Sequence, residues 1–246
     1  SALKELREFA EHTLKWQQIP VREKKILFVG EEISFASRYR VEHFREQLHY
    51  QGYGSDFCQV DEVKDLDWDA YRAVVCYRCS REDVVRKVVE QAKKNGLNVY
   101  YDIDDLIFDY ERISYLHFLT GSEYKDFKKT TEQIHSCMEL CDGYFTSTDT
   151  LAGEIRREFP GKPVVINRNC ASMEMQILSH DAVEQVEKDP EHIFIGYFSG
   201  SKTHDQDFEV AEEALLEVMK EHPEVRLKLV GVLSDRKMEK FGNKVE

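Results

Sequence analysis

The chain has 246 residues, of which 41% are hydrophobic and 33% charged, a balance typical of a globular protein with one or two domains. Its formal net charge of −13 argues against wide contact with nucleic acid, because neutralising phosphates requires a basic face. The apolar runs are too short to cross a bilayer and the N-terminus lacks a signal-peptide pattern, so we expect a cytoplasmic location.

Residues 1–22 are predicted to form an amphipathic helix, over residues 3–18, followed by a linker. Pro20 ends the helical pattern. We expect the apolar face of this helix to cover either the following domain or an upstream one. Its apolar positions, close to helical spacing, are Leu3, Leu6, Phe9, Ala10, Leu14 and Ile19.

Residues 23–171 alternate between short apolar runs and helical patterns, which predicts an α/β domain with a doubly wound, parallel, Rossmann-like sheet. The expected strands are 25–30, 55–60, 71–77, 98–102, 143–147 and 163–167. The expected helices are 38–51, 82–95, 124–141 and 150–159.

A second, incomplete α/β domain is predicted over residues 191–246. Residues 172–190 are polar and partly helical, and we interpret them as the connection between the domains. A strand at 193–199, a helix at 207–221 and a strand at 226–231 then form one strand–helix–strand unit. We therefore expect the missing part of this domain to come from a later segment of the same protein.

Six cysteines offer two interpretations. Cys76, Cys79, Cys137 and Cys141 would in principle supply four thiolates to zinc. Their spacing is not a standard zinc pattern, however, and Cys76 belongs to an apolar run. Buried free thiols are therefore favoured, and no metal site is predicted.

The densest acidic cluster follows the fourth expected strand and contains Asp102, Asp104 and Asp105. Ligands of open α/β sheets bind outside the carboxyl ends of the strands, so these three are the candidate catalytic residues. Asp102 and Asp104 form a D-x-D triplet, which is suited to a divalent cation that bridges a diphosphate. The alternative is an acidic turn in which Asp102 or Asp105 caps the next element.

The loop after the first strand contributes Arg38 and Arg40, whose guanidinium groups are suited to sugar or phosphate. The alternative is that both arginines pair with nearby glutamates, namely Glu31, Glu32 or Glu42.

Two further loops supply candidate binding residues. Arg168 and Asn169 follow the sixth expected strand and would face the same crevice as the acidic cluster. Gly200, Ser201 and Lys202 lie between a strand and a helix, where backbone N–H groups and a positive charge favour phosphate. His204 lies in the same loop, and a surface turn before a helix cap is the alternative there.

Five segments in this order resemble the GT-B glycosyltransferases of the large group 1 (family 4) class. The resemblance implies an acceptor-binding N-terminal lobe and a C-terminal lobe that binds a nucleotide-sugar, without a cofactor or an obligate metal. Asp102 and Asp104 would then shape the cleft, and the loop at Gly200–Lys202 would approach the donor diphosphate. The matching segments are Ser37–Leu48, Val99–Asp109, Cys141–Ala152, Val165–Asn169 and Ile195–Asp205.

The chain departs from the family pattern in two places. Lys202 only approximates the family's usual basic residue after the first strand of the second lobe. The E-x7-E donor segment would lie beyond Glu246, so we expect residues 1–246 to be weakly active or inactive alone. Retention of the anomeric configuration is implied by the family likeness only.

The expected function is transfer of a sugar from a nucleotide-sugar to a carbohydrate or lipid-linked acceptor, and a lipid acceptor would bring peripheral membrane association. One alternative is a metal-dependent transferase that uses Asp102 and Asp104. Another is a non-catalytic α/β binding or signalling module, in which Glu31, Glu32 and Asp102 form an acidic pocket.

Overall fold

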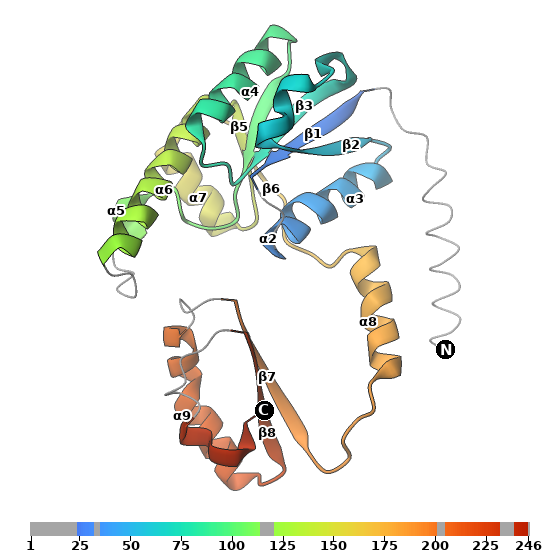
Figure 1. Cartoon of the computed structure of the whole chain (residues 1–246), viewed down its shortest axis with the longest axis vertical. Coiled ribbons are helices and arrows are strands. Elements are labelled where there is room, and N and C mark those ends of the chain that lie inside the picture. The colour runs from blue at the N-terminus through green and yellow to red at the C-terminus, as the bar shows by residue number, and fades with distance from the viewer. Residues whose placement is uncertain (1–23, 32–34, 114–120, 201–204, 232–238, 246) are drawn as a thin grey trace. The chain divides into compact units, whose positions relative to one another are not determined.

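The computed structural model of the chain describes residues 24–31, 35–113, 121–200, 205–231 and 239–245 (Figure 1). The chain divides into two compact units, unit 1 (Ser1–His180) and unit 2 (Asp181–Glu246), and each is described by itself. Their boundary falls inside 172–190, the segment expected to connect two domains. The helix expected over residues 3–18 lies outside the described residues.

Unit 1 is built on a sheet of six strands that are all parallel. The strand order is β2-β1-β3-β4-β5-β6. Each strand agrees with its predicted range to within one residue at either end, so the prediction of a parallel α/β sheet is confirmed. The strands are β1 Lys25–Gly30, β2 Ser55–Gln59, β3 Tyr71–Tyr77, β4 Asn98–Asp102, β5 Gly143–Thr146 and β6 Val164–Ile166.

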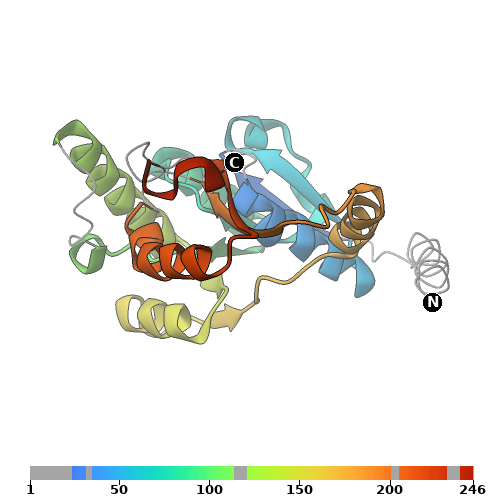
Figure 2. The same cartoon turned by 90° about the horizontal axis from the view of Figure 1, so that it is seen from below.

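Helices cover both faces of this sheet (Figures 1 and 2). Alternate side chains of its central strands therefore enter two separate cores. Leu27 and Val74 belong to the larger core, whereas Phe28 and Val75 belong to the smaller one. The smaller core also holds Val41 and residues of α3 (His43–Tyr50). The helices of the larger core are α4 Glu82–Lys94, α6 Gly121–Leu140 and α7 Asp149–Glu158.

Residues 38–50 are helical, close to the predicted range 38–51, but they are not α-helical throughout. The chain first forms a short helix, α2 (Phe35–Ser37), and then a π-helical stretch, Arg38–Glu42, before α3 begins. The wider π turn accompanies the burial of Arg40. Such turns are frequent at functional sites, and sequence periodicity does not reveal them.

Several shorter elements complete unit 1. They are 3-10 helices at Val60–Asp65 and Trp68–Ala70, a one-turn helix α5 at Tyr110–Ile113, and α8 at Met173–Gln185, which begins in unit 1. The helical part expected within 172–190 corresponds to α8.

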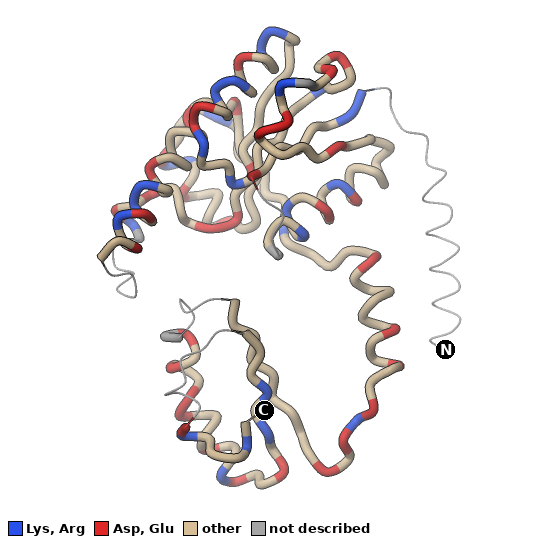
Figure 3. Tube along the Cα trace, viewed as in Figure 1, with Lys and Arg blue, Asp and Glu red and all other residues tan. Residues whose placement is uncertain are grey.

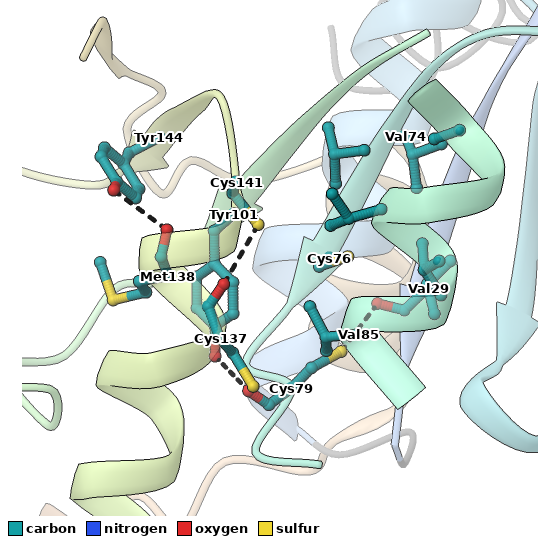
Figure 4. Close-up of a cluster of buried hydrophobic side chains, with 14 of the residues drawn as sticks. Val29, Val74, Cys76, Cys79, Val85, Tyr101, Cys137, Met138, Cys141 and Tyr144 are labelled. Atoms are coloured by element: carbon teal, nitrogen blue, oxygen red, sulfur yellow. Dashed lines mark hydrogen bonds between the residues drawn. The ribbon is translucent and has the colours of Figure 1, made fainter. Parts of the chain in front are cut away.

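Cys76, Cys79, Cys137 and Cys141 lie together in the larger core around Tyr101 (Figure 4). The Tyr101 hydroxyl donates to the Cys79 carbonyl at 2.6 Å. These four and Cys58 are buried free thiols, as expected, and Cys170 is exposed. Burial raises the pKa of Cys58 to about 11 and that of Cys137 to about 12, so these thiols stay protonated. Among the described residues, no group of three His, Cys, Asp or Glu is placed to hold a metal ion.

Unit 2 has the predicted strand–helix–strand order. Strands β7 (Ile193–Ser199) and β8 (Val225–Gly231) are parallel, and α9 (Asp205–Glu221) connects them. Phe208 and Leu227, both fully buried, belong to its core. Side chains on the other face of the sheet stay in solvent, and Phe198 is 75% exposed.

Acidic and basic residues are interspersed along the described trace of both units (Figure 3). No helix among the described residues is long and apolar enough to cross a membrane.

Candidate functional site

The topology of unit 1 marks one edge of the sheet as the place for a ligand. In an open parallel sheet, ligands bind outside the carboxyl ends of the strands, where the strand order reverses. β2 and β3 lie on opposite sides of β1, so the reversal falls between β1 and β3. Glu31 and Arg78 directly follow these two strands, and Asp102 ends the next strand, β4.

At this edge, Arg40 and Asp102 form a fully buried ion pair. The Arg40 Nε atom donates to Asp102 Oδ1 at 2.8 Å, and Nη2 donates to Oδ2 at 2.7 Å. Both side chains are 0% exposed. This bidentate pair fixes the π-helical stretch to the end of β4. The two residues are 62 positions apart in the sequence.

The third nitrogen of the same guanidinium binds the segment after β6. Arg40 Nη1 donates to the Asn167 carbonyl at 2.5 Å and to Asn169 Oδ1 at 3.0 Å. Arg40 therefore joins three segments of the chain, and each of its guanidinium nitrogens already has a partner within the protein. Its side chain is placed to position the edge and not to contact a ligand directly.

Burial governs the ionisation of this pair. It raises the pKa of Asp102 to about 6, although the hydrogen bond and charge of Arg40 lower it. At neutral pH Asp102 is thus an ionised carboxylate with both oxygens engaged by Arg40. A divalent cation would have to displace this guanidinium, so the geometry does not favour Asp102 as a metal ligand.

Arg78 has the most unusual backbone at this edge, with a φ of +45°. This left-handed conformation costs a non-glycine residue about 1 kcal/mol or more, and such strain tends to occur at functional sites. The Arg78 N–H donates to the Asp102 carbonyl at 3.1 Å, which ties the turn to β4.

The side chain of Arg78 is held by the acidic cluster. Its Nε and Nη2 atoms donate to Asp104 Oδ1 at 2.9 and 2.7 Å, and Nη2 also contacts the Asp105 carboxylate. The three side chains remain accessible, with exposed fractions of 25% for Arg78, 10% for Asp104 and 56% for Asp105. Burial lowers the pKa of Arg78, but the two carboxylates outweigh it and the pKa is raised. Arg78, Asp104 and Asp105 are called the edge triad below.

Glu31 fastens the neighbouring turn. Its carboxylate accepts hydrogen bonds from the Ser80 N–H at 2.5 Å, the Ser80 hydroxyl at 2.9 Å and the Arg81 N–H at 2.8 Å. These donors lie at the start of α4, where a negative charge is favourable. Glu31 thus supports the loop that carries Arg78.

The remaining candidates are placed less centrally. Arg168 pairs with Asp149 at 2.5 Å, and both side chains are mostly exposed. The Arg168 hydrogen bond lowers the pKa of Asp149. Arg38 is exposed on the π-helical stretch, and Asn169 serves as an acceptor for Arg40.

The predicted phosphate loop belongs to unit 2 and is described only in part. Gly200 is exposed and follows the end of β7. Ser201, Lys202 and His204 lie outside the described residues.

One of the earlier alternatives is overturned by these contacts. Arg40 pairs with Asp102 and not with Glu31 or Glu42, because the π turn directs it to the sheet. Arg78 was not among the predicted site residues. Its position directly after a buried strand, within Cys76–Cys79, was the available signal.

A scan against protein-family models finds no match for this chain, and a search of curated proteins finds no significant match. Function is therefore inferred from the residues and contacts of the chain itself.

Proposed function

We propose that this chain is part of a two-lobed glycosyltransferase of the GT-B type, which transfers a sugar from a nucleotide-sugar to a carbohydrate or lipid-linked acceptor. One observation carries the proposal. Three of the segments that resemble this class, Ser37–Leu48, Val99–Asp109 and Val165–Asn169, meet at the guanidinium of Arg40. Segments dispersed over 130 residues thus converge on the edge of the sheet where α/β proteins bind ligands.

The edge triad is suited to hydroxyl-rich acceptors. Carboxylates accept hydrogen bonds from sugar hydroxyls, and a guanidinium donates to their oxygens. Because Asp104 is held by Arg78 and is 10% exposed, its orientation is fixed before an acceptor arrives. The buried Arg40–Asp102 pair also stabilises this arrangement, because the backbone N–H of Arg78 donates to the Asp102 carbonyl.

The donor would be held by unit 2 in this proposal. Backbone N–H groups after β7 and the charge of Lys202 would stabilise the diphosphate that leaves during transfer. No metal is assigned to this step. Asp102 and Asp104, the candidate metal ligands, are both engaged by arginines.

The test is nucleoside diphosphate release from a panel of UDP-, GDP-, ADP- and dTDP-sugars, by the protein whose open reading frame contains these 246 residues. We expect turnover with one donor class and a fall on the order of 10- to 100-fold for Arg78→Ala, because a charged hydrogen bond contributes about 1.5–3 kcal/mol. Arg86→Ala is the matched control. Arg86 forms an exposed pair with Glu82 on α4 and should leave the rate unchanged.

Other outcomes distinguish the alternatives. Folded protein that neither turns over nor binds any of these donors would overturn the proposal and favour a non-catalytic module. Activity that requires Mn²⁺ and is lost in Asp104→Asn would favour the metal-dependent transferase.

A further inference from the structure

A concave surface of unit 1 lies where β1 and β2 begin, at the opposite ends of these strands from the edge triad. It is a groove of about 670 Å³ between α3 and the first turns of α8. We call it the α3–α8 groove. Its walls and floor include Glu46, Tyr50, Tyr53, Met173, Ile177 and Lys25.

The walls of this groove are fixed to each other. The Met173 N–H donates to Glu46 Oε1 at 3.0 Å, which joins the start of α8 to α3. His43 Nδ1 and the Cys170 carbonyl are 2.8 Å apart, which holds the segment before α8 on the same helix. The groove is therefore a preformed feature of unit 1.

The lining combines an apolar interior with a rim that carries both charges. Tyr50, Tyr53, Met173 and Ile177 are half-buried and give the groove its apolar character. On one side Glu42 pairs with Arg45 at 3.1 Å, and on the floor Lys25 pairs with Asp56 at 3.2 Å. On the other side Glu174 is an exposed carboxylate on α8. This surface suits the apolar face of an amphipathic helix.

We propose that the α3–α8 groove is the docking site of this chain's own N-terminal segment, residues 1–19. At 100° per residue, Leu3, Leu6, Phe9, Ala10 and Leu14 fall on one broad stripe of a helix, and Trp16 lies about 20° beyond Phe9 at its edge. The adjacent flank carries Lys4, Arg7 and Lys15, together with Glu11, and its basic residues are complementary to the exposed Glu174.

The position of the segment along the chain selects it over other occupants. Lys25 lines the groove, and residues 20–24 span at most about 18 Å between it and the amphipathic segment. A link of this length gives an effective concentration on the order of millimolar, which a second copy or a separate protein must exceed. The groove thus offers an apolar partner for the apolar face that the sequence predicts in this segment.

The two tryptophans of the chain, Trp16 and Trp68, permit a direct test. In Trp68→Phe, Trp16 is the only indole and borders the apolar stripe, so its emission reports whether the segment is docked. We expect blue-shifted emission that acrylamide quenches poorly and that does not change on dilution.

Substitutions in the groove should release the segment. Ile177→Asp, in the Trp68→Phe background, should lower the ratio of docked to free segment by a factor on the order of ten and red-shift the emission. Leu178→Asp is the matched control, because Leu178 is 53% exposed on the same helix and does not line the groove. Glu174→Lys changes only an exposed rim charge, so its red shift would not be due to unfolding.

The proposal is overturned if Trp16 emits as a solvent-exposed indole in Trp68→Phe. It is equally overturned if Ile177→Asp and Leu178→Asp behave alike. A blue shift that disappears on dilution would assign the groove to a second copy of the chain and would also reject the intramolecular proposal.

Discussion

Replacing Arg40 with methionine tests whether the buried ion pair organises the edge of the sheet. The substitution preserves much of the side-chain length but removes four hydrogen bonds, two to Asp102, one to the Asn167 carbonyl and one to Asn169. The Asp102 carboxylate, which is 0% exposed, is then left without a partner. Breaking a buried pair in this way costs about 3–5 kcal/mol of unfolding free energy.

The loss should depend on pH in a defined direction. In the folded wild type, burial holds the pKa of Asp102 at about 6, above its usual value. Without Arg40 that pKa rises further, so the folded variant takes up a proton at a pH where the wild type does not. The stability difference between the two proteins should therefore shrink as the pH falls from 8 towards 6.

Urea unfolding in a Trp16→Phe background measures this effect, because Trp68 then reports on unit 1 alone. Arg86→Met is the control. Arg86 makes an exposed pair with Glu82 one turn away on α4, and such pairs contribute about 0–1 kcal/mol. The double variant Arg40→Met/Asp102→Leu should recover much of the loss, since apolar replacement of a buried pair is often neutral.

The reasoning is refuted if Arg40→Met costs no more than Arg86→Met. It is also refuted if the loss is the same at pH 6 and pH 8, because an unpaired buried carboxylate must respond to pH in that range.

Three further predictions concern backbone strain, packing and thiol accessibility. Arg78→Gly should change the unfolding free energy by less than about 1 kcal/mol, because relief of its left-handed backbone offsets the lost ion pairs, while nucleoside diphosphate release falls. Gly143→Ala should destabilise the protein by about 1–3 kcal/mol in urea unfolding, because the new Cβ would lie 2.8 Å from Pro163 Cγ. Gly153→Ala on α7 meets open space and should stabilise the protein by about 0.5–1 kcal/mol. Iodoacetamide should label only Cys170 in the native chain and all six cysteines after unfolding, as read by mass spectrometry; early labelling of a buried thiol would contradict the described core.

Local patterns were sufficient to predict most of the secondary structure. In α4, Val84, Val85 and Val88 recur at helical spacing, and Gly96 follows the helix with a φ of +70°. The strands were found because apolar runs such as Lys25–Gly30 are short and separated by helical patterns. The π-helical stretch was missed, because inserting one residue in a turn leaves no distinct periodicity.

The place of the acidic cluster in the fold follows from the sequence, whereas its contacts do not. Asp102, Asp104 and Asp105 were identified because they follow a strand, and the parallel sheet does place them at its carboxyl edge. Their partners, Arg40 and Arg78, come from segments 62 and 26 residues away. Neither pairing follows from spacing along the chain.

The sequence by itself determined the alternation of strands and helices, the apolar faces and the position of the acidic cluster, since each depends on neighbouring residues. Only the tertiary structure decided that Asp102 is buried against Arg40 while Asp104 remains accessible beside Arg78. The physical reason is that burial depends on which distant segments pack over a residue. Two aspartates separated by one residue therefore differ in ionisation, exposure and the role they are able to take.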